Sequence, residues 1–185
     1  MLELKGPLFH STIKYIKKME GEERYKAYIA QLPGDVQAFL TKPILSSKFY
    51  PVELLKQMTL GYIAFTGKDA MATYRDIGMV SADEGFSGIY KIFFKVGTPA
   101  AMIKTAPFVF KAYYSQGLMK AENTEKNTAQ IRISGSGIDH VFLCARLSGF
   151  IQKTMELAGG LNVRVDHFSC FAKGSPTEEW VGKWD

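Results

Sequence analysis

The spacing of the apolar residues changes at Gly117, and this change constrains the fold more than any other feature of the chain. Before Gly117, apolar side chains recur three and four positions apart, as at Leu55, Met58 and Tyr62. Such spacing places them on one face of a helix. After Gly117, the stretch 129–133 (AQIRI) alternates apolar and polar residues, as a strand buried on one face does. The pattern predicts an α+β fold with N-terminal helices packed on a C-terminal sheet.

Proline, glycine and threonine mark the expected helix boundaries. Pro51 occupies a position where its missing N–H costs nothing, so a helix is expected to start there and to end at Gly67. Thr98 is expected to cap a later helix through its side chain. Pro107 is expected to kink or restart that helix. Between Gly67 and Thr98, the segments up to residue 79 and from residue 86 to 96 are also expected to be helical.

A strand–helix–strand–strand unit is expected to close the chain. The alternating strand is followed by a long helical stripe, with Asp139 as its cap and the glycines at 159–160 as its end. Residues 161–171 and 179–184 are expected to be strands joined by a turn. Neither a repeat nor an interdomain linker interrupts the sequence. Residues 1–185 are therefore expected to form a single domain.

Composition and charge argue against several classes of protein. The chain has 185 residues and a net charge of +5, and the basic residues near its start are interrupted by glutamates, which is typical of a solvated helix face and not of a nucleic-acid surface. No apolar run reaches the roughly 18 residues of a membrane span, and the opening residues lack the apolar core of a secretory signal. Two cysteines do not make a disulfide framework, so a reducing, cytoplasmic setting is expected.

Histidine and cysteine lie three positions apart near the end of the chain, at His167 and Cys170. In a straight strand they point to opposite faces and bind one metal ion together only if a bulge intervenes. The apolar residues change from odd to even positions at this point, so the sequence is compatible with a bulge but does not require one. The other imidazole and thiol residues, His10, His140 and Cys144, are scattered in the sequence, whereas zinc takes four ligands. No metal is expected, His167 and Cys170 being the weak candidates, and Cys170 is expected to be a buried, inert thiol.

Motifs of the common catalytic sites are missing from the sequence. The run Gly135-Ser136-Gly137 lacks the spacing of a nucleophile elbow, and no Walker-type or dinucleotide-binding glycine pattern occurs. Arg146 is most simply a surface or capping residue of the last helix. The chain is therefore expected not to be an enzyme.

Aromatic residues and methionines are concentrated between residues 86 and 119. They are expected either to line a pocket for an apolar ligand or to form plain core, because ligand pockets and cores draw on the same side chains. The candidates for ligand binding are Met102, Phe108, Phe110, Tyr113 and Tyr114.

Short motifs spread along the chain carry a family resemblance. They are Tyr-Pro at 50–51, YRDIG at 74–78, Thr-Pro at 98–99, YYSQG at 113–117 and HFSCFAKGSP at 167–176. In this order they resemble a paralogous family of unknown function abundant in myxobacteria. The C-terminal half is also similar to 4-vinyl-reductase-type domains, which resemble haem–nitric-oxide-binding domains and TRAPP-type tethering subunits in fold. The resemblance implies helices before an antiparallel sheet, an apolar or lipid-like cavity, and often a dimer.

The chain departs from these families at two positions. Glu178 stands where the vinyl-reductase type has a second cysteine, and Gly117 stands where the haem-binding Tyr-x-Ser-x-Arg clamp has its arginine. No cofactor is therefore expected. We predict a non-enzymatic binding or sensory module, a homodimer, that takes an apolar small molecule or lipid. The alternatives are a dimerising scaffold without a ligand and a haem or metal sensor.

Overall fold

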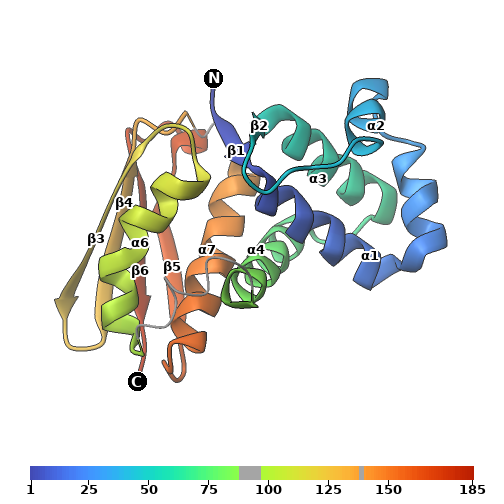
Figure 1. Cartoon of the computed structure of the whole chain (residues 1–185). Helices are drawn as coiled ribbons and strands as arrows, with labels where there is room; N and C mark the ends of the chain where they lie inside the picture. Colours follow the sequence, from blue (N-terminus) through green and yellow to red (C-terminus); the bar gives the residue numbers. More distant parts are fainter. Residues whose placement is uncertain (88–96, 138–139) are drawn as a thin grey trace.

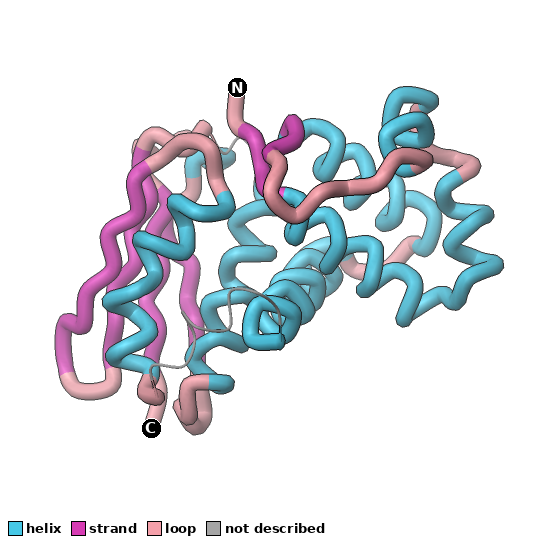
Figure 2. Tube along the Cα trace, in the orientation of Figure 1, coloured by secondary structure: helices cyan, strands magenta, loops and turns pink. Residues whose placement is uncertain are grey.

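The computed structural model describes residues 1–87, 97–137 and 140–185 and has the predicted α+β architecture (Figure 1). The N-terminal half is helical, and an antiparallel sheet closes the chain, as the tube in Figure 2 shows. The helices are α1 (Gly6–Ile29), α2 (Gly34–Leu40), α3 (Val52–Thr66), α4 (Ala70–Ser87), α6 (Pro99–Tyr113) and α7 (Val141–Leu157). The strands are β1 (Glu3–Lys5), β2 (Phe49–Pro51), β3 (Leu118–Glu125), β4 (Thr128–Ser134), β5 (Arg164–Ser169) and β6 (Glu178–Lys183), and a 3-10 turn spans Phe171–Lys173.

Local signals in the sequence place most helix ends correctly. Gly67 ends α3 with a left-handed φ of 66°, and the Thr98 side chain accepts a hydrogen bond from the Ala101 N–H at the start of α6. Pro107 lies inside α6 without ending it. Residues 88–96, most of the expected 86–96 helix, and Asp139, the expected cap of α7, lie outside the described residues; the ring of His140 caps α7 by accepting from the Phe142 N–H.

A buried polar network ties the outer N-terminal helices together. The Glu20 side chain on α1 is only 6% exposed and lies 2.6 Å from Lys68 Nζ, while the Tyr62 hydroxyl on α3 donates to it at 2.8 Å. Hydrogen bonding from Lys68, with smaller contributions from Tyr62 and Arg24, outweighs burial and lowers the pKa of Glu20 to about 2.

Helices α4 and α7 cross so closely that only glycine fits at the crossing. A Cβ at Gly78 would lie 1.9 Å from the Arg146 carbonyl oxygen, and a Cβ at Gly149 would lie 1.9 Å from the Arg75 carbonyl oxygen. Each glycine therefore faces the backbone of the other helix. The crossing joins the N-terminal helices to the sheet side of the molecule (Figure 1), and it explains the glycine in the YRDIG motif.

The C-terminal sheet has the strand order β3-β4-β6-β5, and every neighbouring pair is antiparallel. Alternate residues of β4 and β6 face the core: Ile131 pairs with Trp180, and Ile133 pairs with Glu178. Helix α6 packs beside β3 and α7 beside β5 and β6, and α7 lies between the sheet and α4 (Figure 1). The sheet thus has one buried face and one exposed face.

One strand of this sheet was not predicted. β3 carries a largely polar sequence, LMKAENTE, because it is an edge strand and most of its residues are exposed. The expected unit of strand, helix, strand and strand is therefore preceded by a further strand. Strand β3 owes its place to main-chain pairing with β4 and not to an apolar pattern of its own.

Candidate functional site

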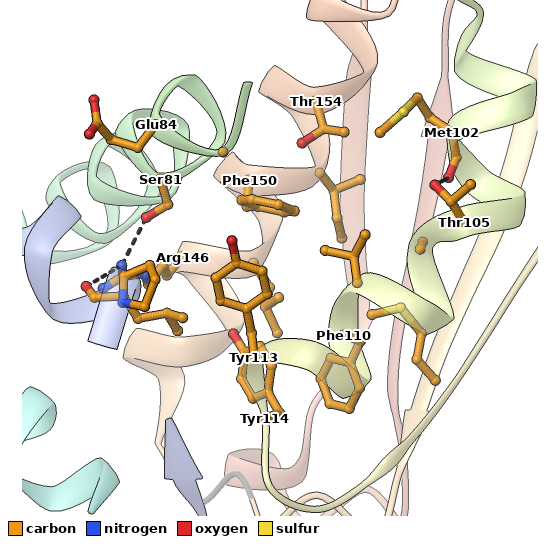
Figure 3. A pocket seen from close by; sticks show the side chains of 18 of the residues that line it. Ser81, Glu84, Met102, Thr105, Phe110, Tyr113, Tyr114, Arg146, Phe150 and Thr154 are labelled. Carbon is orange, nitrogen blue, oxygen red and sulfur yellow. Dashed lines mark hydrogen bonds between the residues drawn. The ribbon is translucent and has the colours of Figure 1, made fainter. Parts of the chain in front are cut away.

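A cavity of about 400 Å³ lies among α1, α4, α6, α7 and the sheet. Its wall is largely apolar, and Figure 3 shows its side chains converging from α6 on one side and α7 on the other. The volume falls in the lower part of the range that small-molecule sites occupy. Its wall from α6 and the sheet includes Met102, Ile103, Thr105, Ala106, Val109, Phe110, Tyr113, Tyr114, Met119 and Ile131, and its wall from α7 includes Leu147, Phe150, Ile151, Thr154 and Met155.

Four of the five predicted ligand-binding residues lie in this wall. Met102, Phe110, Tyr113 and Tyr114 face the cavity, and the Phe110 and Tyr114 rings stack with centroids 4.4 Å apart. Phe108 does not belong to the wall. Its side chain is 60% exposed, because it lies on the side of α6 that faces away from the sheet and α7. A ligand-binding role for Phe108 stays a prediction.

Arg146 on α7 also lies in the cavity wall, and the expectation that it is a surface residue was wrong. It is only 4% exposed. One terminal nitrogen donates to the Thr12 hydroxyl at 2.7 Å, and the other lies 2.7 to 2.8 Å from the Leu8 carbonyl and the Ser11 and Ser81 hydroxyls. Burial lowers the pKa of Arg146 to about 10, so the guanidinium stays charged at neutral pH.

Sequence periodicity could have placed Arg146 correctly. The apolar stripe of the last helix contains Leu143, Leu147 and Phe150, and Arg146 is three and four positions from two of them. A charged residue within such a stripe is buried with partners or reaches out of it. Thr154, one turn beyond Phe150, is also buried in the wall, and its hydroxyl oxygen has no hydrogen-bond partner among the described residues.

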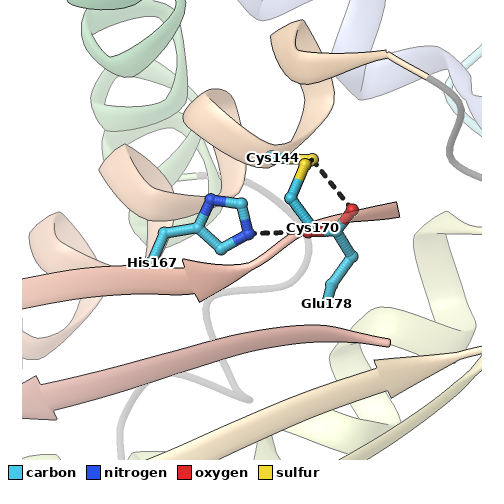
Figure 4. Close-up of side chains that lie close together, drawn as sticks. All are labelled: Cys144, His167, Cys170 and Glu178. Carbon is cyan, nitrogen blue, oxygen red and sulfur yellow. Dashed lines mark hydrogen bonds and ion pairs between the residues drawn. The ribbon is translucent and has the colours of Figure 1, made fainter. Parts of the chain in front are cut away.

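A second group of reactive side chains lies near the start of α7. Cys144, His167, Cys170 and Glu178 each place one ligand atom within 4.8 Å of the others (Figure 4). The two sulfur atoms are 3.6 Å apart, the Cys144 thiol donates to Glu178 Oε1 at 3.1 Å, and His167 Nε2 lies 2.6 Å from Glu178 Oε2. The His167 ring stacks on Trp180. These residues come from α7, β5, the turn after β5, and β6.

A bulge brings His167 and Cys170 to the same site. The pairing of β5 with β6 shifts register between His167 and Ser169, so Cys170 is carried to the face that His167 occupies. The sequence did not decide between a straight strand and a bulge at this point. Cys144, which is distant in the sequence, joins His167 and Cys170 in space, because the fold gathers all three around Glu178.

The protonation states of this cluster follow from burial and hydrogen bonding. Burial disfavours the carboxylate of Glu178, but hydrogen bonds from His167, Cys144 and the Phe171 N–H outweigh it and lower the pKa of Glu178. Burial, followed by the neighbouring carboxylate, raises the pKa of the Cys144 thiol. At neutral pH the Glu178 carboxylate therefore lies beside a protonated Cys144 thiol.

The donor types and spacing suit a tetrahedral metal ion. Zinc binds cysteine, histidine and carboxylate ligands at about 2.0–2.3 Å, which in a tetrahedron separates the ligand atoms by about 3.3–3.8 Å. The sulfur–sulfur distance already lies in this range. The hydrogen bond between His167 and Glu178 is shorter and would have to open to admit an ion.

Comparison with known proteins finds similarity in structure alone. No family model and no curated protein sequence matches the chain. The fold is that of H-NOX proteins. An H-NOX protein from S. oneidensis, a variant in the Fe(II) ligation state, superposes with a TM-score of 0.80 at 14% identity, covering 98% of this chain and 96% of its own.

Two further structures give the same result. Unliganded Fe(II) H-NOX from K. algicida has a TM-score of 0.76 at 13% identity, with 98% of this chain and 97% of its own covered. A third structure, solved in a study of haem redox potential and porphyrin distortion, has a TM-score of 0.73 at 12% identity, with 98% and 100% covered. Among the described helices, none combines the length and apolar character that a membrane span requires.

Proposed function

We propose that the protein is a non-enzymatic ligand-binding module of the sensor type, and that it takes an apolar small molecule into the cavity between α6 and α7. The observation that carries this proposal is a cavity of about 400 Å³, walled mainly by apolar side chains. Its wall also includes a few polar groups, as in ligand pockets generally. The fold is shared with H-NOX proteins whose structures were determined in defined iron ligation states, and this likeness supports a ligand-binding role.

Among the described residues of the cavity wall, the groups that would hold a haem are engaged elsewhere or missing. Helix α6 contains no histidine. His10, the histidine of the cavity wall, lies on α1 with its Nε2 2.8 Å from the Ile44 carbonyl oxygen. Haem iron in proteins is held by histidine, by a cysteine thiolate, by methionine together with histidine, or by tyrosine. Burial raises the pKa of Tyr114 to about 12, which disfavours the phenolate form that a tyrosine ligand needs.

The propionate clamp is also missing, and the structure explains why. Gly117 has a φ of 105°, and a Cβ there would lie 2.8 Å from the Ser136 Cβ. An arginine at this position would need both a strained backbone and a displaced neighbour. The Ser115 hydroxyl accepts a hydrogen bond from the Glu3 N–H at 2.8 Å, so the serine of the motif joins β1 to the end of α6. The proposed function therefore does not include haem.

The experiment for the cavity is native mass spectrometry of the purified protein, followed by organic extraction and analysis of the extract. We expect an apolar compound to co-purify, or an environment-sensitive apolar dye to bind with a stoichiometry of one. Phe110→Trp, which adds volume to the cavity wall, should reduce binding, whereas Phe108→Trp on the outer side of α6 should not. The proposal is wrong if the protein binds neither an endogenous compound nor the dye. It is also wrong if Phe110→Trp and Phe108→Trp reduce binding equally.

We propose as a second function that Cys144, His167, Cys170 and Glu178 bind one zinc ion. Four donors of types that zinc accepts, all within 4.8 Å, favour this proposal. The site would act mainly on stability, because it joins α7 to β5 and β6 near the end of the sheet. Binding requires the thiols to lose their protons, so zinc affinity should fall as the pH is lowered.

Zinc titration of metal-free protein tests this site. The wild type should bind one equivalent and unfold at a higher temperature with zinc than with a chelator. Cys144→Ser and His167→Ala should abolish both effects. Glu179→Gln is the matched control, because Glu179 lies next to Glu178 and pairs with Arg132 instead of the cluster. A wild type that binds no zinc, or variants that bind it as the wild type does, would argue for a metal-free packing cluster.

The predicted homodimer stays a prediction. Light scattering at micromolar concentration tests it, and a monomer with a bound ligand would remove the scaffold alternative.

A further inference from the structure

The cavity contains a buried positive charge that no carboxylate of the described residues neutralises. Arg146 is 4% exposed, and the four groups within hydrogen-bond distance of its terminal nitrogens are a carbonyl and three hydroxyls. Its Nε–H donates to none of the described residues. Neutral acceptors stabilise the guanidinium but leave its charge uncompensated, and a buried unpaired charge is costly.

The acidic residue in the cavity wall is engaged elsewhere. Glu84 on α4 lies in the same wall, but its carboxylate forms an ion pair with Lys14 on α1, and its side chain is 38% exposed. Of the ion pairs among the described residues, none includes Arg146. The charge is therefore available to a ligand that enters the cavity.

We propose that the natural ligand is a fatty acid or a similar amphiphile, with its carboxylate against Arg146 and its apolar chain between α6 and α7. This inference rests on the proposed ligand-binding function and names its ligand class. A carboxylate matches the planar guanidinium and offsets the buried charge. The remaining wall is mainly apolar, its other polar members being Glu84, His10 and several hydroxyl-bearing residues, and it suits a hydrocarbon chain.

The direction and length of the ligand's hydrocarbon chain follow from the course of α7. Arg146, Phe150 and Thr154 lie on successive turns of this helix and all belong to the wall, as Figure 3 shows. Eight residues of helix correspond to about 12 Å. The cavity therefore has a charged end at Arg146 and extends past Phe150 to Thr154, a length that suits a medium-chain acid.

Calorimetric titration with decanoate and with decanol, which share one chain length, tests the inference on the full chain. The wild type should bind decanoate at least about tenfold more tightly than decanol, because a hydrogen bond to a charged group contributes more than one to a neutral group. Arg146→Lys, which keeps the charge, should retain a preference for decanoate. Arg146→Met should lose it while still binding decanol. Lys111→Met, which removes a positive charge from the exposed side of α6 outside the cavity wall, is the matched control and should keep the wild-type preference.

The outcomes separate this inference from the proposed function. If the wild type binds the two ligands equally, the cavity is a ligand site without a carboxylate preference, and the fatty-acid inference is overturned. If it binds neither, the ligand-binding proposal itself fails. Arg146→Met removes a partner of buried hydroxyls and could prevent folding, but the wild-type comparison and Arg146→Lys remain decisive in that case.

Discussion

The close crossing of α4 and α7 predicts a large cost for adding one methyl group at Gly149. A Cβ there would lie 1.9 Å from the Arg75 carbonyl oxygen and 2.7 Å from its carbonyl carbon. Such contacts are not observed below 3.0 Å, so the helices would have to separate by roughly 1 Å. Both contact atoms belong to helical backbone, which cannot move aside by changing a rotamer. We expect Gly149→Ala to lower the free energy of unfolding by about 3 kcal/mol, the upper part of the usual range for overpacking.

Two other glycines provide matched controls for this substitution. A Cβ at Gly34 would have no atom within 4 Å, so Gly34→Ala should be neutral or stabilising by up to about 1 kcal/mol. A Cβ at Gly61 would meet the end of the Leu32 side chain at 2.5 Å, and this flexible group can turn away, so the cost should be intermediate. The expected order of stability is Gly34→Ala, then Gly61→Ala, then Gly149→Ala.

Urea denaturation followed by circular dichroism measures these differences. For a chain of this length, about 3 kcal/mol corresponds to a fall in Tm of roughly 6–12 °C. Gly78→Ala adds a methyl group at the same crossing, so the double variant with Gly149→Ala should deviate from additivity. The reasoning is refuted if Gly149→Ala unfolds within about 0.5 kcal/mol of Gly34→Ala, because the crossing would then tolerate a side chain.

Three further predictions concern the buried acid, the sheet and the cavity. Because the pKa of Glu20 is lowered to about 2, its stabilisation is complete above its ordinary pKa and is lost as the pH falls toward 2. The free energy of unfolding, measured as a function of pH, should fall by up to about 3 kcal/mol over this interval. In Glu20→Gln this acid-induced fall should be smaller. Ser148→Ala leaves the Trp180 indole N–H, which donates to Ser148 at 2.9 Å, without its partner, and should cost about 1–3 kcal/mol in urea denaturation. Phe110→Ala should alter ligand uptake, measured by native mass spectrometry, more than it alters dimerisation, whereas Phe108→Ala should change uptake little; a broken dimer with unchanged uptake would instead place α6 at a subunit interface.

The sequence determined the secondary structure wherever a local signal exists. The helical spacing around Met58, the alternation in β4 and the caps at Gly67 and Thr98 each depend on residues within a few positions, and the structure confirms them. Strand β3 has no such signal, because an exposed edge strand needs no apolar pattern. The α+β class could therefore be predicted, but the full set of strands could not.

The cavity wall could be predicted from the sequence only in part. The spacing of α6 indicated Met102, Phe110, Tyr113 and Tyr114 as candidates, although it could not tell the outer position of Phe108 from the inner ones, because that depends on where the sheet and α7 lie.

Only the tertiary structure decided which polar groups are buried and which of them meet. The apolar stripe around Arg146 indicates that its helix face is buried, but only packing against α1 and α4 shows which neutral acceptors surround its guanidinium. Cys144, His167 and Glu178 lie on separate elements, and strand pairing, a one-residue bulge and the position of α7 bring them to within a few ångströms of each other. Local periodicity fixes the direction of a side chain relative to its own helix or strand, whereas such convergence depends on how distant elements pack, and that is set by burial summed over the whole core.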